Sequence, residues 1–251
     1  MSTGITSFIL QGTLSAGEIR ALVGKDDPVI LEVGANCGQT TVELLRAMPG
    51  ATIHAFEPDP RAIAKFRNTV RNPRVHLYEC AVGASNGAVT FHQSSGAEHM
   101  PEYLQGWDQS GSIRRPNTHL QVWPWVKFEK QIEVNIMTLD SWSEQHQVTA
   151  ADFIWADVQG AESDLIAGAA QLLPSVRYLY TEYSNDEWYE GQITLAALAN
   201  RLPNFELVRR YQTDVLFKNK QPQYSTRASW HVPSQRAAES QRGTRGTIKN
   251  D

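Results

Sequence analysis

Short apolar stretches alternate along this chain with longer stretches in which apolar residues recur every three or four positions. Residues 29–33 are followed by "TTVELLRAM", and "TIHAFEP" is followed by "PRAIAKFRNTV". The short stretches are typical of buried strands, and the longer ones are typical of amphipathic helices. A strand and a helix in regular alternation predict a parallel sheet with helices packed on its faces.

The second half of the chain continues this alternation. "RVHLYECAVG", "AVTFHQ" and "QIEVNIMTLD" predict three further strands. The near-continuous apolar runs in "DFIWADVQG" and "SVRYLYTEYS" are typical of central strands that are covered on both faces. "ESDLIAGAAQLL" and "QITLAALANRL" predict helices, and "FELVRRYQTDVLFKN" predicts two closing strands around a tight turn. We therefore expect a doubly wound α/β fold.

Two segments interrupt the pattern. Residues 94–130 mix polar residues, glycines, prolines and clustered aromatic residues. An insertion of this length in a compact domain is usually functional, so we expect a lid. Residues 219–251 are polar and carry six basic against two acidic residues. We expect them to form a flexible basic tail, which leaves one folded domain over residues 1–218.

Composition and charge narrow the class of protein. The net charge of −4 and the pI of about 6.0 argue against a general nucleic-acid binder. No stretch of 18 apolar residues and no basic, apolar leader is present, so we expect neither membrane insertion nor secretion. Cys37 and Cys80 are too few for a disulfide framework. A reducing, cytoplasmic setting fits best.

A sharp glycine turn, "ILEVGANCGQTT", follows the first strand, where parallel sheets bind their ligands. Gly34 and Gly38 let the backbone turn and let a ligand approach. A dinucleotide fold would place glycines where this chain has Asn36 and Gln39, which disfavours an NAD-dependent oxidoreductase. The acidic Glu32 would repel a phosphate and suits a ligand with an ammonium group.

A second acidic residue, Glu57, ends the next strand. It lies 57 − 34 = 23 residues after the first glycine of the turn. This is close to the offset of about 20 residues at which an acidic side chain takes ribose hydroxyls. An adenosine that carries an amino-acid tail fits both acidic residues.

Five motifs together carry a resemblance to a known family: "ILEVGANCGQTT", "AFEPDP", "ECAVG", "TLDSW" and "DFIWADVQGAESDLIAG". In this order and spacing, over roughly residues 28–218, the chain resembles the FkbM family of class I S-adenosylmethionine-dependent methyltransferases. The resemblance implies a Rossmann-like, mostly parallel seven-stranded sheet with a final antiparallel strand and an inserted lid. It also implies S-adenosyl-L-methionine as the cofactor.

The resemblance implies a role for individual residues as well. Residues that would hold the methionine part of the cofactor are Glu32, Gly34, Asn36 and Gly38. Glu57 would bind the ribose, the backbone of Cys80, Ala81 and Val82 would hold the adenine, and Asp157 would also face the cofactor. The chain departs from the family at Gln159, where an acidic residue is usual, while Asp157 and Glu162 keep the family pattern.

Three residues are candidates for the chemistry. Methyl transfer is an in-line displacement, and a hydroxyl acceptor must also lose a proton. Asp157 ends the strand expected beside the first one, so it is our first candidate to position the acceptor or take its proton. Glu182 should reach the same crevice from the next strand, and His119 in the lid is a third candidate. Asp157 and Glu182 could instead hold Mg²⁺, but two side chains make a weak metal signal, and we assign no metal site.

The resemblance implies O-methylation of a hydroxyl on a sugar or a small-molecule biosynthetic intermediate. N-methylation of an amine is an alternative that needs less help from a base. A non-catalytic module that keeps the cofactor pocket is another, with Gln159 as its only hint. We expect a small-molecule or sugar acceptor and neither a nucleic-acid nor a membrane partner, while the sequence leaves the oligomeric state open.

Overall fold

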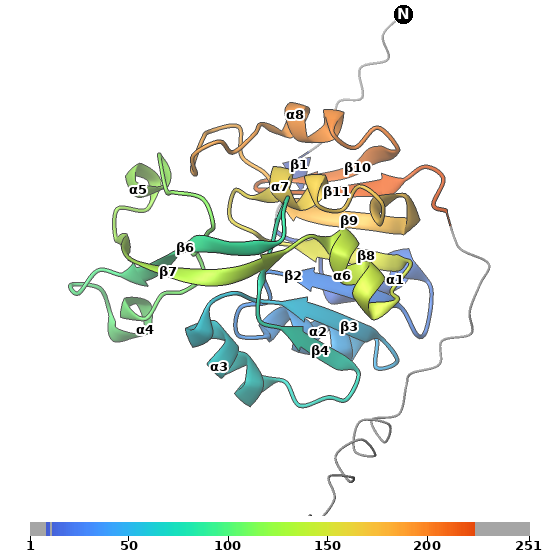
Figure 1. Ribbon diagram of the computed structural model, residues 1–251, viewed down its shortest axis with the longest axis horizontal. Helices are drawn as coiled ribbons and strands as arrows, with labels where there is room; N and C mark the ends of the chain where they lie inside the picture. Colours follow the sequence, from blue (N-terminus) through green and yellow to red (C-terminus); the bar gives the residue numbers. More distant parts are fainter. Residues whose placement is uncertain (1–8, 11, 224–251) are drawn as a thin grey trace, which may run out of the picture.

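A computed structural model describes residues 9–10 and 12–223 and shows a large twisted sheet with a second, smaller sheet beside it (Figure 1). The large sheet has eight strands in the order β1-β10-β11-β9-β8-β2-β3-β4. Its strands are β1 (Ile9–Leu10), β2 (Val29–Val33), β3 (Thr52–Phe56), β4 (Val75–Tyr78), β8 (Ala151–Ala156), β9 (Val176–Glu182), β10 (Phe205–Tyr211) and β11 (Asp214–Asn219).

The strand directions confirm the predicted mostly parallel sheet. Strands β4, β3, β2, β8 and β9 pair in parallel, and the last strand, β11, is antiparallel to both of its neighbours. The two-residue β1 adds an eighth strand in parallel with β10 at the edge, which we did not expect. The N-terminal segment thereby covers an otherwise open edge of the sheet.

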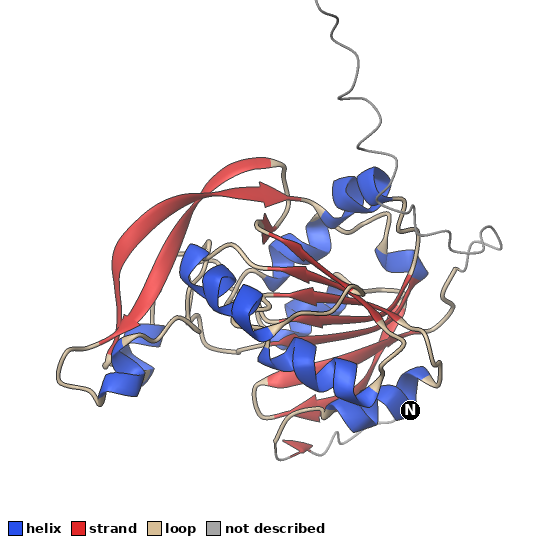
Figure 2. Cartoon of the chain, turned by 90° about the horizontal axis from the view of Figure 1, so that it is seen from below, coloured by secondary structure: helices blue, strands red, loops and turns tan. Residues whose placement is uncertain are grey.

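Helices cover both faces of the sheet (Figure 2). One face packs on α1 (Ala16–Val23), α2 (Gln39–Ala47) and α3 (Pro60–Thr69), and the other packs on α6 (Leu139–His146), α7 (Glu162–Ala167) and α8 (Leu195–Asn200). Successive residues of β2 show the division, because Leu31 packs toward α6 and α7 while Ile30 packs toward α1 and α2. The fold is therefore doubly wound, as predicted. None of the described helices is long and apolar enough to cross a membrane.

One predicted helix is shorter than expected. Within "ESDLIAGAAQLL" the helix α7 ends at Ala167, and a 3-10 turn, η1 (Leu173–Ser175), precedes β9. A side chain at Gly168 would overlap the backbone carbonyl of Gly83 and approach Thr138. The chain turns at Gly168 because this close approach to the connection after β5 leaves no room for a Cβ atom.

The prediction of one strand over "RVHLYECAVG" was wrong. The strand breaks after Tyr78, and residues 81–82 form a separate strand, β5 (Ala81–Val82), which belongs to the smaller sheet. There β5 pairs in parallel with the end of β7 (Val126–Met137), and β7 pairs in antiparallel with β6 (Gly87–Gly96). The chain leaves the large sheet because β7 offers a second set of backbone partners.

The lid is the far end of the β6/β7 hairpin, which projects beyond the large sheet (Figure 2). The hairpin strands are longer than predicted, so the segment between them is residues 97–125 and not 94–130. Two short helices, α4 (Glu102–Gln105) and α5 (His119–Val122), lie in this segment. The strands extend because their antiparallel register continues to Gly96 opposite Val126, with one irregularity between Gln93 and Ser95.

The predicted tail begins too early. Asn219 is the last residue of β11, is buried, and donates its side-chain amide to the carbonyl oxygens of Pro174 and Val176 at 3.1 and 2.9 Å. The backbone N–H of Gln223 also bonds to Pro174. Residues 219–223 therefore belong to the folded part, and the rest of the predicted tail lies outside the described residues.

A buried histidine lies in the aromatic cluster between β3, β4 and α6. The His54 ring contacts His76, Tyr78 and Trp142, with its Nδ1 atom 3.1 Å from the Tyr78 hydroxyl. Burial, together with the nearby His76 and His146, lowers the pKa of His54 to about 3. The folded protein therefore keeps this ring neutral at a pH where an unfolded chain protonates it.

We predict that His54→Gln reduces the acid sensitivity of the fold. The unfolded chain takes up a proton on His54 below pH 6.5, approximately, whereas the folded protein does so only near its lowered pKa, so stability is lost as the pH falls between these values. In the variant, the free energy of unfolding should change less steeply with pH, by up to about 1.4 kcal/mol per pH unit. Urea unfolding at pH 7 and pH 5 measures it. The exposed His99→Gln is the control, and an unchanged slope in His54→Gln would contradict the assignment.

We predict opposite effects for two glycine-to-alanine substitutions. Gly34 has φ +86°, and a Cβ there would overlap the carbonyl oxygen of Asp157, so Gly34→Ala should destabilise the fold by more than 2 kcal/mol, approximately. Gly17 lies exposed in α1 with open space around it, so Gly17→Ala should stabilise by about 0.5–1 kcal/mol. Thermal unfolding of both variants tests these predictions. An unchanged melting temperature in Gly34→Ala would show that the contact with Asp157 does not exclude a side chain at residue 34.

Candidate functional site

A cavity lies beyond the carboxyl ends of β2, β3 and β8. Its empty space, including the part that opens to solvent, measures about 540 Å³. It is lined by Val33, Gly34, Phe56, Glu57, Pro58, Cys80, Ala81, Val82, Phe91, Asp108, Gly111, Ser112, Ile113, Asp157, Val158 and Ala161. The predicted ligand crevice of the parallel sheet is thus present, and the lid supplies one of its walls.

The glycines of the first turn are required mainly by packing. A side chain at Gly34 would overlap the backbone of Asp157, and one at Gly38 would overlap Val70 and Phe66 beside α3. Both glycines also have φ above +80°. Gly34 lines the cavity but Gly38 does not. We expected both to give a ligand room, and the structure instead assigns Gly38 to the contact between the turn and α3.

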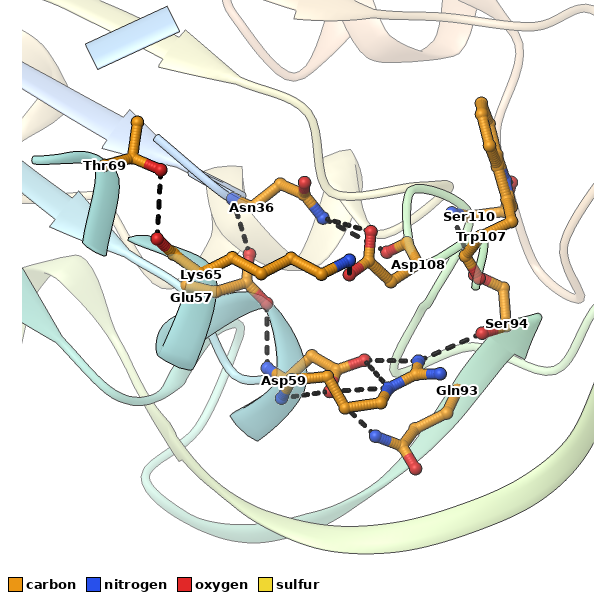
Figure 3. Close-up of polar contacts among 11 residues, drawn as sticks. Asn36, Glu57, Asp59, Lys65, Thr69, Gln93, Ser94, Trp107, Asp108 and Ser110 are labelled. Atoms are coloured by element: carbon orange, nitrogen blue, oxygen red, sulfur yellow. Dashed lines mark hydrogen bonds and ion pairs between the residues drawn. The ribbon is translucent and has the colours of Figure 1, made fainter. Parts of the chain in front are cut away.

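Glu57 lies where the sequence placed it, at the cavity edge after β3. Its two carboxylate oxygens accept the backbone N–H groups of Asn36 at 2.8 Å and Asp59 at 2.7 Å (Figure 3). Burial raises the pKa of Glu57 to about 8, while these two donors act in the opposite direction. Each oxygen keeps acceptor capacity for a further donor such as a hydroxyl.

Three predicted cofactor residues do not line the cavity: Glu32, Asn36 and Gly38. Glu32 is buried beneath the turn, where it accepts the Thr41 hydroxyl at 2.6 Å, and burial raises its pKa to about 8. Asn36 holds the Glu57 carboxylate through its backbone. The structure therefore shows these residues supporting the turn and the Glu57 side chain.

The predicted "CAV" segment, Cys80 to Val82, does line the cavity. Burial raises the pKa of the Cys80 thiol to about 11, so the thiol stays protonated at neutral pH. Cys37 is partly exposed and lies outside the cavity lining. Both cysteines are free thiols.

The lid residue Asp108 was missed by the sequence analysis. It lines the cavity beside Glu57, and its carboxylate binds Lys65 Nζ of α3 at 2.6 Å (Figure 3). Asn36 Nδ2 donates to the Asp108 backbone oxygen and to its Oδ1, both at 3.2 Å. These contacts span 43 and 72 residues of sequence, so no local pattern could have revealed them.

Two carboxyl groups meet at the other side of the cavity. Asp157 follows β8 and Glu182 ends β9, and the parallel pairing of these strands brings the two side chains together. Gln159 Nε2 lies 2.7 Å from Asp157 Oδ1 and 2.9 Å from Glu182 Oε2. Burial raises the pKa of Asp157, and burial together with the charge of Asp157 raises the pKa of Glu182 well above its usual range. The pair as a whole therefore gives up its protons at a higher pH than two isolated carboxyl groups would.

Tyr189, on the loop after β9, contacts this group through its hydroxyl. Its hydroxyl lies 2.9 Å from Gln159 Oε1 and 2.8 Å from the Ser110 carbonyl oxygen of the lid. The Ser112 hydroxyl of the lid donates to the Gln159 carbonyl oxygen at 2.7 Å. Lid, loop and sheet thus converge on the turn that holds Gln159. The sequence gave no indication of a role for Tyr189. For Gln159 it showed only the departure from the family pattern.

His119 lies in an aromatic cluster under the lid and not in the cavity lining. Its ring packs against Trp123, Phe128 and Tyr189, and burial lowers its pKa to about 4. The structure places it behind Tyr189, so it is not brought together with Asp157 and Glu182. We therefore leave His119 out of the proposed chemistry.

The other lid residues are engaged with the protein itself. Arg114 binds the Asp164 carboxylate, with Nε donating at 2.9 Å. The tryptophans form two edge-to-face pairs, Trp107 with Trp125 and Trp123 with Trp188. These contacts account for the tryptophans of the lid as packing, whereas Tyr103 is exposed. Within residues 9–10 and 12–223, no three His, Cys, Asp or Glu side chains gather as a metal site would require.

Comparison with known proteins identifies the family. The Methyltransferase FkbM domain matches residues 32–218. The chain is 44% identical over 207 residues to the 2-O-methyltransferase NoeI of Sinorhizobium fredii, covering 80% of this chain and 84% of that protein. It is 24% identical over 178 residues to the 31-O-demethyl-FK506 methyltransferase FkbM of Streptomyces tacrolimicus, covering 66% of this chain and 68% of that protein.

A solved fibrillarin/Nop5p complex is also similar, with a TM-score of 0.43, 14% identity and coverage of 82% of this chain and 81% of that one. The domain match extends from β2 to β11, and the relatives are methyltransferases, so neither the oxidoreductase nor the scaffold alternative is supported. The chain belongs to the FkbM family of S-adenosylmethionine-dependent methyltransferases.

Proposed function

We propose that this enzyme methylates a hydroxyl oxygen on a sugar or a small-molecule biosynthetic intermediate. The observation that carries the proposal is the half-buried carboxyl pair of Asp157 and Glu182, with Asp157 lining the cavity where a reacting hydroxyl needs a proton acceptor. The names of two relatives, a 2-O-methyltransferase and a 31-O-demethyl-FK506 methyltransferase, both specify transfer to oxygen.

The residues of the cavity fit S-adenosylmethionine. Glu57 presents a carboxylate with free acceptor capacity for ribose hydroxyls, and it is held rigidly by two backbone N–H groups. Residues 80–82 with Phe56 offer a mostly apolar wall for the adenine ring. The opening beside Gly34 would take the methionine part. We extend the set predicted from sequence by the lid residue Asp108, which lines the same cavity.

When bound, the cofactor supplies a methyl group on a positively charged sulfur. Asp157 would take the proton of the acceptor hydroxyl as its oxygen accepts the methyl group. Glu182 would share the charge of the carboxyl pair with Asp157 through the Gln159 amide. The lid, joined to the rim through Asp108, holds the reactants together and excludes water.

An amine acceptor is a weaker second candidate. An uncharged amine attacks the methyl carbon without the help of a base, so the Asp157–Glu182 pair would have no role in that reaction. We also propose that Mg²⁺ is not needed, because an amide N–H is directed at both carboxyl groups.

We propose one catalytic domain and a cytoplasmic location. Two free thiols, Cys37 and Cys80, support a reducing compartment. The net charge of −4 supports a small-molecule or sugar acceptor over a nucleic acid.

We predict that Glu57→Gln weakens S-adenosylmethionine binding by about 1–3 kcal/mol. The substitution keeps the shape of the side chain but replaces one of its two acceptor oxygens by an amide NH2 group, which cannot accept from a hydroxyl. Isothermal titration calorimetry with S-adenosylmethionine and S-adenosylhomocysteine measures the affinity. Glu43→Gln, on the exposed face of α2, is the matched control and should bind both compounds like the wild type. Equal affinities for the two variants would contradict the ribose assignment.

We predict that Asp157→Asn lowers turnover about 10²–10⁴-fold with little change in cofactor affinity, because the variant lacks the proton acceptor. Release of S-adenosylhomocysteine, measured with a panel of methyl glycosides and amino sugars, gives the rate and separates hydroxyl from amine acceptors. Since burial raises the pKa of Asp157, wild-type turnover should begin to fall with decreasing pH above the usual aspartate range. The exposed Asp186→Asn serves as control. A fully active Asp157→Asn would remove Asp157 from the chemistry.

A further inference from the structure

Gln159 occupies an unusual position between the two carboxyl groups of the site. Its amide nitrogen donates to Asp157 Oδ1 at 2.7 Å and to Glu182 Oε2 at 2.9 Å, so both amide hydrogens are used. Its amide oxygen faces the Tyr189 hydroxyl at 2.9 Å. The side chain is therefore fixed at both ends, and its two hydrogens are directed at two acids on neighbouring strands.

The backbone of Gln159 provides a second, independent observation. Gln159 has φ +50°, in the left-handed region that side chains other than glycine and asparagine rarely adopt. The neighbouring Gly160 also has a positive φ, and a side chain there would overlap Tyr189. A glycine at 159 would fit this conformation with less strain, so the chain keeps a glutamine where its backbone does not favour one. Strained residues of this kind are concentrated at functional sites.

We propose that Gln159 is a positioning residue, whose two amide hydrogens align the carboxyl groups of Asp157 and Glu182 and so orient the Asp157 oxygen that receives the acceptor's proton. The inference rests on the proposed function. The inference assigns a role to residue 159, the one position at which the motif "DVQGAE" departs from the family pattern. An acidic residue at 159 would place a third carboxyl group against two others, whereas the amide supplies donors to both.

Other ionisable groups also face this pair and set the electrostatic background. They are Glu162 of α7, Asp214 of β11 and Tyr189 of the loop after β9. Burial raises the pKa of Glu162 to about 7, and Arg114 of the lid opposes this rise. Two carboxyl neighbours, a tyrosine hydroxyl and no directly bound cation make the amide of Gln159 the main donor to Asp157 among the described residues. Without it, the pKa of the pair should rise.

The first experiment reads the carboxyl pair directly and needs no acceptor. The full-length protein, saturated with S-adenosylhomocysteine, is titrated while the infrared carbonyl stretch of protonated carboxyl groups is recorded. The bands lost in Asp157→Asn and Glu182→Gln assign the signal to the pair. We expect the titration midpoint of the pair to move to higher pH in Gln159→Leu and Gln159→Gly, and further in Gln159→Glu. An unchanged midpoint in all three variants would overturn the proposal.

Stability and cofactor affinity separate positioning from a merely structural role. Gln159→Gly relieves the left-handed strain, so its melting temperature should not fall, and its affinity for S-adenosylhomocysteine should match the wild type because Gln159 does not line the cavity. Turnover on the best methyl glycoside should nevertheless drop about 10- to 100-fold, as expected for the loss of hydrogen bonds to a charged group. The exposed Gln171→Leu is the control. Equal losses of stability, affinity and turnover in Gln159→Gly would overturn the proposal.

Two further outcomes are distinguishable. Full turnover of Asp157→Asn would remove the proposed function, whatever the Gln159 variants show. Loss of wild-type turnover in EDTA, restored by Mg²⁺, would mean that the amide oxygen and not the amide hydrogens faces the two carboxyl groups around a cation, which overturns the inference while leaving methyl transfer intact.

Discussion

The site depends on the parallel pairing of β2 with β8. This pairing continues past the strands, where the Asp157 N–H bonds to the Val33 carbonyl oxygen at 2.9 Å and the Asp157 carbonyl lies against Gly34. The approach leaves no room for a side chain at Gly34. It fixes the first turn, which supports Glu57, against the turn that carries Asp157 and Gln159. The Glu57 side and the Asp157 side of the cavity are therefore held together by one contact between two backbones.

Burial of acidic groups is the second constraint. Glu32, Glu57, Asp157 and Glu182 all lie in or under the site, and burial raises the pKa of each. Each of these groups accepts a hydrogen bond. Glu32 accepts from a hydroxyl, Glu57 from backbone N–H groups, and Asp157 and Glu182 from a side-chain amide. A buried carboxyl group without such partners would strongly destabilise the fold. The donors thus make it possible to keep several acids in and beneath one site.

The lid completes the site from a distance in sequence. Its Asp108 reaches Lys65 and Asn36 at the rim, and Ser110 and Ser112 reach the group around Gln159. One segment between β6 and β7 therefore contacts both the Glu57 side and the Gln159 side of the cavity. The arrangement allows the two reactants to be enclosed together, which favours near-attack geometry over hydrolysis.

The sequence by itself determined the alternation of strands and helices, the glycine turn, and the positions of Glu57, Asp157 and Glu182, because strand periodicity and turn chemistry are local properties. Only the tertiary structure decided that residues 81–82 leave the large sheet, that Glu32 and Asn36 support the turn rather than line the cavity, and that His119 lies behind Tyr189. It alone brought Asp108 to the rim and placed the Gln159 amide between two acids. These features come from contacts between residues far apart in the chain, and hydrophobic periodicity carries no information about which distant partners will meet.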